Sequence, residues 1–254
     1  MSAAISYALD GPVAWLTINR PEARNALNRE VREGLFDGFR RFSADAAARV
    51  LVLTGAGDRA FCAGGDLKEM AADALQVPPP DFLPQLGRNI DVDKPVIAAV
   101  NGVAYAGGFL LAQNCDLVVA ADTARFAITE VKVGRGAPWA APLPWLIPPR
   151  AAMQLLLTGD PIDAARAHQL GLVNEVVPLS GLRAAAQSLG ERIAANAPLS
   201  VLAGKRTVRL MADLPLADAY RRAEEIWAPV YRSQDAQEGP RAFTERRRPV
   251  WRGI

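Results

Sequence analysis

The most constraining feature of the sequence is an apolar strand that runs through a glycine turn into a helix. Residues 95–100 form an unbroken apolar run typical of a buried strand, and residues 109–115, free of Gly and Pro, suit the first turns of a buried helix. Gly102, Gly107 and Gly108 lie between them. The first N–H groups of a helix lack intrahelical acceptors and lie at the positive end of its dipole. The stretch therefore predicts a site that stabilises a developing negative charge.

Composition excludes several classes of protein. The chain has 254 residues, of which 50% are hydrophobic and 22% charged, so it can bury a sizeable core. The formal net charge of +2 gives no global field that would attract nucleic acid. Cys62 and Cys115 make no disulfide framework, and we expect a reducing, cytoplasmic location. We expect neither a signal peptide nor a membrane span, because no apolar run reaches about 18 residues.

Strand–turn–helix units dominate the first part of the chain, which indicates an α/β fold. A second glycine turn at 61–66 follows a predicted strand at 49–54, and prolines make 73–87 a predicted loop. Helices dominate after about residue 195, so we predict a core at 1–195 and a helical region at 196–254. The other predicted strands are 13–18, 117–121 and 171–177. The first predicted helix is capped by Asn28, and the later ones are 151–157, 164–170, 182–196, 199–212 and 216–231. A basic tail follows the last helix.

Glu130 is the carboxylate of greatest interest. It ends residues 126–130, an apolar segment that is predicted to be extended. Such a residue can simply face outward from a strand, or it can be desolvated by its neighbours, which would raise its pKa and suit it for proton transfer.

Other chemically interesting residues favour plainer interpretations. His168, the only histidine, lies on a predicted helix without a nucleophile motif nearby, so a helix-surface or packing role is expected. Cys62 lies among small residues, so a packing role is expected for it. No His, Cys and carboxylate cluster has metal-ligand spacing, and no metal is expected. The arginines of 241–252 indicate either a solvated terminus or a phosphate or subunit contact.

Three ordered motifs resemble the crotonase (enoyl-CoA hydratase/isomerase) superfamily over nearly the whole chain. They lie at 19–28, at 61–70 and from 94 to 116, and two shorter matches lie at 167–174 and 238–243. The resemblance implies a ClpP/crotonase-like spiral of ββα units with a C-terminal helical trimerisation region. It also implies an acyl-CoA ligand, carried as a coenzyme A thioester without a bound cofactor, and an oxyanion hole made by the N–H groups of Gly65 and Gly107.

The same resemblance assigns substrate-binding residues. The turn at 61–68 would cradle the adenine, and Arg24 or Lys68 would meet the coenzyme A phosphates. The full predicted substrate-binding set is Arg24, Ala26, Ala63, Asp66, Leu67, Lys68, Leu110, Trp139 and Phe243. The partners expected are an acyl-CoA and further copies of the chain, as a homotrimer or a dimer of trimers, with no nucleic acid and no membrane.

One departure from the family pattern decides the predicted reaction. Hydratases of this family carry one glutamate at the position of Leu110 and another at that of Glu130. Leucine cannot activate water, whereas moving a double bond requires a single base. Mitochondrial Δ3,Δ2-enoyl-CoA isomerases are similar at both positions and share an Ala-Pro-aromatic turn like that at 137–139.

We therefore predict an enoyl-CoA isomerase with Glu130 as its acid/base. The first alternative is an enoyl-CoA hydratase that uses a second group from the 73–93 loop, such as Asp81, Asp91 or Asp93. The other alternative is a weakly catalytic coenzyme A-binding subunit.

Overall fold

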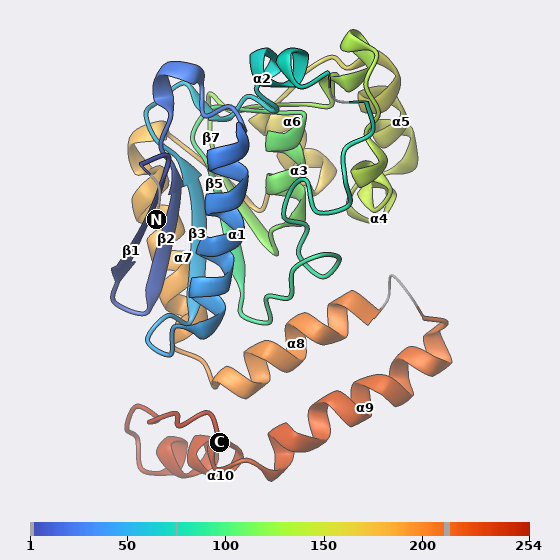
Figure 1. Cartoon of the computed structure of the whole chain (residues 1–254). Coiled ribbons are helices and arrows are strands. Elements are labelled where there is room, and N and C mark those ends of the chain that lie inside the picture. Colours follow the sequence, from blue (N-terminus) through green and yellow to red (C-terminus); the bar gives the residue numbers. More distant parts are fainter. Residues whose placement is uncertain (1–2, 75, 211–213) are drawn as a thin grey trace.

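The protein folds as an α/β core from which a helical arm extends (Figure 1). The arm is the part of the chain from Pro198 onward. The structure is a computed structural model that describes residues 3–74, 76–210 and 214–254. Both glycine turns lie in the core, and the arm contains the last three helices (Figure 1).

The larger sheet has six strands in the order β1-β2-β3-β5-β7-β10. Its strands are β1 (Ile5–Asp10), β2 (Val13–Ile18), β3 (Val50–Gly55), β5 (Val96–Val100), β7 (Leu117–Ala121) and β10 (Glu175–Val177). β1 pairs antiparallel with β2, and the other pairs are parallel. Parallel strands need both faces covered, which explains why β5 is buried at every residue.

Helices α1 (Arg29–Ala44) and α7 (Leu182–Ala194) cover opposite faces of this sheet (Figure 1). Gly38 of α1 lies against the side chain of Leu16, whereas Gly190 of α7 lies against that of Val13. Leu16 and Val13 are three residues apart on β2, so they point to opposite faces. The predicted cap of α1 is confirmed, because the Asn28 side chain accepts a hydrogen bond from the Val31 N–H at 3.0 Å.

A second, smaller sheet runs beside the first, and the chain passes from one sheet to the other in successive ββα units. This smaller sheet has the order β4-β6-β8-β9, with β4 (Ala60–Cys62), β6 (Val103–Tyr105), β8 (Arg125–Ala127) and β9 (Ile162–Asp163). Two successive units each give one strand to each sheet and then turn into a helix: β3, β4 and α2 (Leu67–Ala72), then β5, β6 and α3 (Gly107–Asn114). The predicted ββα units are confirmed, and the two glycine turns occupy equivalent places in consecutive units.

The remaining helices complete the core and form the arm. They are α4 (Leu143–Leu146), α5 (Pro149–Thr158), α6 (Ala164–Leu170), α8 (Pro198–Leu210), α9 (Leu216–Arg232) and α10 (Gln234–Thr244), with 3-10 helices η1 (Pro21–Ala23), η2 (Thr129–Val133), η3 (Pro138–Ala140) and η4 (Leu179–Gly181). None of the helices in the described ranges is long and apolar enough to cross a membrane.

Three expectations about secondary structure were wrong, and one edge strand was not predicted. Residues 126–130 are not one extended segment, because β8 ends at Ala127 and Glu130 lies in η2. The segment 171–177 is a strand only from Glu175, because Gly171 caps α6 in the left-handed region with φ 88°. The tail after 231 contains the helix α10, and β1 was not predicted. The end of the predicted helix 199–212 lies outside the described residues.

The arm is attached to the core by a partly buried ion pair. Lys205 of α8 contacts the Asp116 carboxylate at 2.7 Å, and Arg209 contacts its other oxygen at 3.1 Å. The Lys205 ammonium also donates to the carbonyl oxygens of Val92 and Lys94, at 2.9 and 2.7 Å. Beyond α8 the arm exposes several large apolar side chains, namely Leu216, Tyr220, Tyr231, Phe243, Val250 and Ile254.

Candidate active site

The two glycine turns lie against each other. A Cβ built on Gly64 would lie 2.9 Å from the Cβ of Ala106 and 3.6 Å from the backbone nitrogen of Gly107. A Cβ built on Gly107 would lie 3.8 Å from the Cα of Gly64. The parallel pairing of β4 with β6 brings the ends of these strands together. Only glycine allows the two backbones to approach this closely.

Both turns present backbone N–H groups at the start of a helix. Gly107 is the first residue of α3, so its N–H has no intrahelical acceptor. Gly65 lies just before Asp66, the N-cap of α2, and in the described part of the chain its N–H donates to no backbone carbonyl. In the described part of the chain both N–H groups are therefore open to an acceptor outside the backbone, close to the N-terminal ends of α3 and α2.

The Gly107 turn contains a strained residue. Ala106 has φ 50° and ψ −117°, a conformation that residues with a Cβ rarely adopt. Two backbone hydrogen bonds hold it there: its N–H donates to the Ala127 carbonyl at 2.9 Å, and its own carbonyl accepts from the Leu110 N–H at 3.0 Å. The strained residue comes directly before Gly107, so its conformation sets the direction of the first N–H group of α3.

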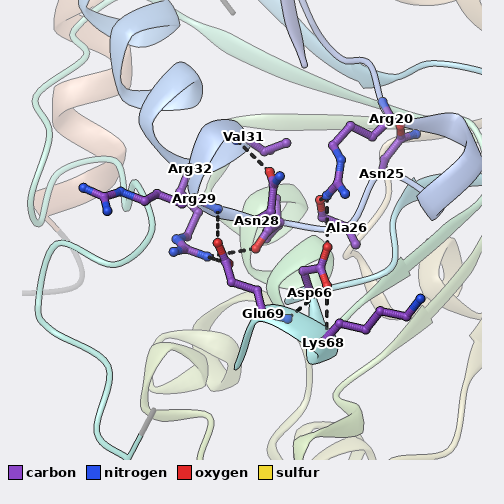
Figure 2. A network of polar contacts seen from close by, with 12 residues as sticks. Arg20, Asn25, Ala26, Asn28, Arg29, Val31, Arg32, Asp66, Lys68 and Glu69 are labelled. Atoms are coloured by element: carbon purple, nitrogen blue, oxygen red, sulfur yellow. Dashed lines mark hydrogen bonds and ion pairs between the residues drawn. The ribbon is translucent and has the colours of Figure 1, made fainter. Parts of the chain in front are cut away.

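A network of polar contacts holds the Gly65 turn (Figure 2). The Arg20 guanidinium donates to the Ala26 carbonyl at 2.8 Å and to the Asp66 carboxylate at 3.2 Å. The other oxygen of Asp66 accepts from the N–H groups of Lys68 and Glu69, at 3.2 and 3.4 Å. Asp66 therefore joins the start of α2 to the loop before α1.

A second ion pair extends the same network. The Glu69 carboxylate accepts from the Arg32 guanidinium at 2.7 Å and from the Arg29 N–H at 2.8 Å. Figure 2 shows these contacts between the first turns of α1 and α2. The two helix starts are thus fixed to each other on either side of the Gly65 turn.

Glu130 is half-buried, and its two carboxylate oxygens differ. Oε1 accepts a hydrogen bond from the Trp139 indole N–H at 3.1 Å. Oε2 is buried without a hydrogen-bond partner among the described residues. Burial raises the pKa of Glu130 above its usual value, and the bond from Trp139 opposes part of that shift. Of the two interpretations of Glu130, the desolvated carboxylate is confirmed and the outward-facing strand residue is wrong.

Apolar and aromatic side chains surround this part of the molecule. Leu110 is 2% exposed and belongs to the core, so its side chain offers no polar group. The Trp139 ring packs on Phe109 with 5.9 Å between ring centroids, whereas Trp145 is 66% exposed. Of the two tryptophans, Trp139 is the one that contacts Glu130.

The predicted substrate-binding residues fall into three places. Ala63, Asp66, Leu67 and Lys68 flank Gly65, with Leu67 and Lys68 exposed, and Ala26 joins them through Arg20. Arg24 lines a separate cavity of about 180 Å³ together with Asn25, Asp58 and Arg59. Phe243 does not join the others, because it lies on α10 in the arm and is 87% exposed (Figure 1).

The carboxylates of the 73–93 loop do not contact Glu130 in the described structure. Asp93 pairs with Arg206 of α8 at 2.7 Å, and Asp81 and Asp91 are exposed. Asp81 lines a cavity of about 720 Å³ between α1, α2 and this loop, which lies apart from Glu130. The loop does reach the site through Leu83, whose side chain lies 3.2 Å from a Cβ built on Gly107.

Cys62 is buried, in agreement with a packing role, whereas His168 is exposed on the surface of α6. Burial raises the pKa of the Cys62 thiol to about 12, so it stays protonated, and its sulfur accepts from the Gly64 N–H at 3.4 Å. The Nδ1 atom of His168 lies 2.9 Å from the Val173 carbonyl oxygen. The described residues contain no group of three or more His, Cys, Asp or Glu side chains that could hold a metal ion.

Sequence reasoning missed three residues that support the site. Arg20 lies within the first family-like motif, yet its contact with Asp66, 46 residues later, has no local signal. Arg59 follows the second predicted strand, and nothing in the sequence pairs it with Arg24. Gln113 interrupts the apolar pattern of α3, which is the one signal that could have drawn attention to it.

Comparison with known families decides the membership of the chain. A family model described as "Enoyl-CoA hydratase/isomerase" matches residues 9–253. The chain belongs to this family. The resemblance inferred from the sequence motifs is thereby confirmed, and so is the assignment of the chain as an enzyme of the hydratase/isomerase type.

Relatives of the enoyl-CoA hydratase/isomerase family match the chain over its full length. A carnitinyl-CoA dehydratase from Citrobacter koseri is 39% identical over 263 residues, covering 100% of both chains. An (E)-benzylidenesuccinyl-CoA hydratase from Thauera aromatica is 41% identical over 258 residues, covering 98% of this chain and 99% of that protein. The chain is similar to a crystal structure of the enoyl-CoA hydratase EchA1 from Mycobacterium marinum, with a TM-score of 0.91, 40% identity and 100% coverage of both. The predicted crotonase-type α/β fold is confirmed.

Proposed function

We propose that this acyl-CoA enzyme moves the double bond of an enoyl-CoA from the Δ3 to the Δ2 position, with Glu130 as its acid/base. The observation that carries the proposal is the contrast between two positions. Glu130 offers a buried oxygen with no hydrogen-bond partner among the described residues, whereas Leu110 is a core side chain. One base can remove a proton and return it to another carbon, but water addition also needs a group that holds the water.

The glycine turns would supply the second element of the reaction. The α-proton of a thioester is weakly acidic, and its removal places negative charge on the thioester oxygen. In this proposal the N–H groups of Gly65 and Gly107 donate to that oxygen, with the dipole of α3 behind Gly107. Loss of one such donor typically costs about 3 kcal/mol of transition-state stabilisation.

The coenzyme A moiety would bind outside the two glycines. The exposed Leu67 and Lys68 lie two and three residues after Gly65, at the start of α2, which places them beside the thioester in this proposal. Arg24 and Arg59 line one cavity of about 180 Å³ and would supply positive charge to phosphate groups. Trp139 and Leu110 would border the acyl group.

Water addition or removal is the second candidate reaction. The names of two relatives, a carnitinyl-CoA dehydratase and a benzylidenesuccinyl-CoA hydratase, favour it. This chemistry would need a second polar group, and the predicted candidates Asp81, Asp91 and Asp93 do not contact Glu130 in the described structure. A coenzyme A-binding subunit with little catalysis is the third candidate, and it would bind acyl-CoA tightly without exchanging the C2 proton with solvent deuterium.

The arm supports a proposal of self-association. It exposes large apolar side chains on α9, α10 and the C-terminal segment, which would be covered in a homotrimer or a dimer of trimers. In the same proposal, a role for Phe243 at an active site depends on a neighbouring copy of the chain.

Paired assays with two substrates test the proposed reaction. The protein is incubated with a 3-enoyl-CoA and, separately, with a 2-enoyl-CoA in water, and products are followed by mass and absorbance. We expect the 3-enoyl substrate to form a conjugated product of the same mass. Addition of water to the 2-enoyl substrate, without isomerisation, would replace this proposal with the hydratase.

Replacement of the base tests the role of Glu130. We expect Glu130→Gln to lower the rate by at least about 100-fold, because the amide cannot accept the proton. Glu175→Gln, at the exposed start of β10, is the matched control and should retain activity. Turnover of Glu130→Gln near that of the unmodified protein would contradict the proposed role. Leu110→Glu would add a second carboxylate to the helix, and we expect it to introduce some hydration of the 2-enoyl substrate.

A further inference from the structure

A chain of hydrogen bonds links Glu130 to the helix that begins at Gly107. The Gln113 side-chain amide, on α3, donates to the backbone carbonyl of Trp139 at 3.1 Å. The Trp139 indole, on η3, donates to Oε1 of Glu130 at 3.1 Å. The separate elements α3, η3 and η2 are therefore joined by hydrogen bonds between residues 26 and 9 positions apart.

The orientation of both linking side chains is fixed. Gln113 is 7% exposed, and exchanging its amide nitrogen and oxygen would place two acceptors against each other. The Trp139 ring packs on Phe109 of α3, and Phe109 packs edge-on against Phe126 of β8, with 6.3 Å between centroids. The chain runs from Phe126 on β8 directly into η2, which carries Glu130. The aromatic contacts and the hydrogen bond from Trp139 therefore fix both the backbone before Glu130 and its side chain.

The arrangement makes the two oxygens of Glu130 unequal. The Trp139 indole N–H can only donate, so the hydrogen bond occupies Oε1 as an acceptor. Protonation of Oε1 would place two hydrogens against each other. Oε2 is buried and has no partner among the described residues. A buried acceptor without a donor is costly, and such groups are concentrated where function requires them.

We propose that Trp139 and Gln113 are positioning residues, in which Trp139 holds Oε1 so that Oε2 alone carries the proton, and Gln113 holds Trp139. This inference rests on the proposed function, in which Glu130 is the acid/base. Oε2 takes the C2 proton, and the electron pair of the C–H bond enters the dienolate that the two glycine N–H groups stabilise. The proton then returns from Oε2 to C4, so Glu130 finishes as the carboxylate it was at the start.

Two charged residues lie close to Glu130 in the chain, namely Lys132 and Arg135. Lys132, on the same turn, contacts Asp160 at 2.7 Å, and Asp160 is the charged side chain that follows α5, the helix packed against this turn. Arg135 donates its backbone N–H to the Glu130 carbonyl at 2.9 Å. On the side of α3, Leu110 and Gln113 are uncharged. The Trp139 indole donates to one Glu130 oxygen and not to the other, so it distinguishes the two.

Two tryptophans of the same segment provide a matched experiment. Trp139→Phe keeps an aromatic ring on Phe109 and removes the N–H, whereas Trp145→Phe makes the same change at an exposed position. We expect Trp139→Phe to lower kcat by about 10-fold with little change in KM, because the substrate still binds while the base is poorly placed. Trp145→Phe should leave both constants unchanged. Gln113→Met should act in the same direction as Trp139→Phe, with a smaller loss.

A second readout does not depend on activity. Infrared difference spectra of the protein against its Glu130→Gln variant, recorded over a range of pH, report protonation of the Glu130 carboxyl. Removal of the Trp139 donor takes away a bond to the charged form, so the midpoint should move to higher pH in Trp139→Phe and Gln113→Met but not in Trp145→Phe. The acidic limb of the kcat profile should move the same way.

The outcomes separate the inference from the proposed function. A kcat and a midpoint in Trp139→Phe equal to those of Trp145→Phe would overturn the positioning role, even if the isomerase is active. A shifted midpoint in a protein that catalyses no isomerisation would support the positioning role and overturn the proposed reaction. Because Gln113→Met leaves Trp139 itself in place, it tests the same chain of bonds if Trp139→Phe fails to fold.

Discussion

The turn at Gly64–Asp66 and the turn at Ala106–Gly108 lie against each other, yet they are held in different ways. Polar side chains hold the first: Asp66 caps α2 and pairs with Arg20 at 3.2 Å, and both groups are partly exposed. Close backbone packing holds the second, where Gly107 and Gly108 are buried and Ala106 is strained. The difference teaches that both turns need glycine where their backbones meet, but that the Gly65 turn depends in addition on charged and hydrogen-bonding side chains.

The largest effect is expected at Gly108. An added Cβ would overlap the carbonyl oxygen of Cys62, which is backbone and cannot move aside, so the two turns would separate. We expect Gly108→Ala to lose about 3 kcal/mol of stability in chemical unfolding and most of its activity. Gly65→Ala is the comparison, because its Cβ would meet the flexible Met70 sulfur at 2.7 Å. An equal loss of stability in both variants would break the distinction between the turns.

The second-largest loss of stability is expected at the turn Gly64–Asp66. Asp66→Ala removes the cap of α2 and the partner of Arg20, and we expect a loss of about 1–2 kcal/mol in unfolding free energy together with a lower kcat. Glu33→Ala is the control, since it removes an exposed ion pair with Arg29 and should cost less than about 0.5 kcal/mol. If the control is equally destabilised, the position of Asp66 at the glycine turn has no special importance.

The two turns should also respond differently to acid. Desolvation acts to raise the pKa of Asp66, but hydrogen bonds from the Glu69 N–H and from Arg20 outweigh it, so the pKa is lowered overall. A lowered pKa in the folded state gives stability that is present above the unfolded value and is lost as the pH falls through the folded value. We expect amides 64–69 to lose hydrogen-exchange protection below about pH 4 before amides 107–112 do, after correction for intrinsic rates. Asp66→Asn should remove this difference, and its persistence in that variant would assign it to another group.

The smallest effect is expected at Ala106. Glycine adopts φ 50° without a Cβ clash, and the relief of about 1–3 kcal/mol of strain exceeds the entropy cost of about 0.5–1 kcal/mol. We expect Ala106→Gly to raise the unfolding free energy by about 1 kcal/mol and to leave KM unchanged. Ala141→Gly, at an exposed residue with φ −50°, should instead be slightly destabilising. Destabilisation of Ala106→Gly to the same extent would show that its φ carries no strain.

Local patterns predicted much of the core. The apolar run before Gly102, the cap at Asn28 and the strand at 117–121 are all found where the sequence placed them. Each depends on neighbours along the chain, namely side-chain period, cap chemistry and the need of close backbones for glycine. The pattern failed at 126–130, because the apolar run continues past Ala127 to Ile128, whereas strand β8 ends at Ala127 and the backbone turns into η2.

Family membership, the two glycine turns and the departure at Leu110 were determined by the sequence alone, since each is a matter of residue type at a given spacing. Only the tertiary structure decided that Glu130 is half-buried with one oxygen bound to Trp139 and the other unpartnered among the described residues. It also decided that Asp66 pairs with Arg20, and that Phe243 lies in the arm. The physical reason is that desolvation and side-chain pairing depend on residues far apart in the chain, which approach each other only when the sheets and helices have packed.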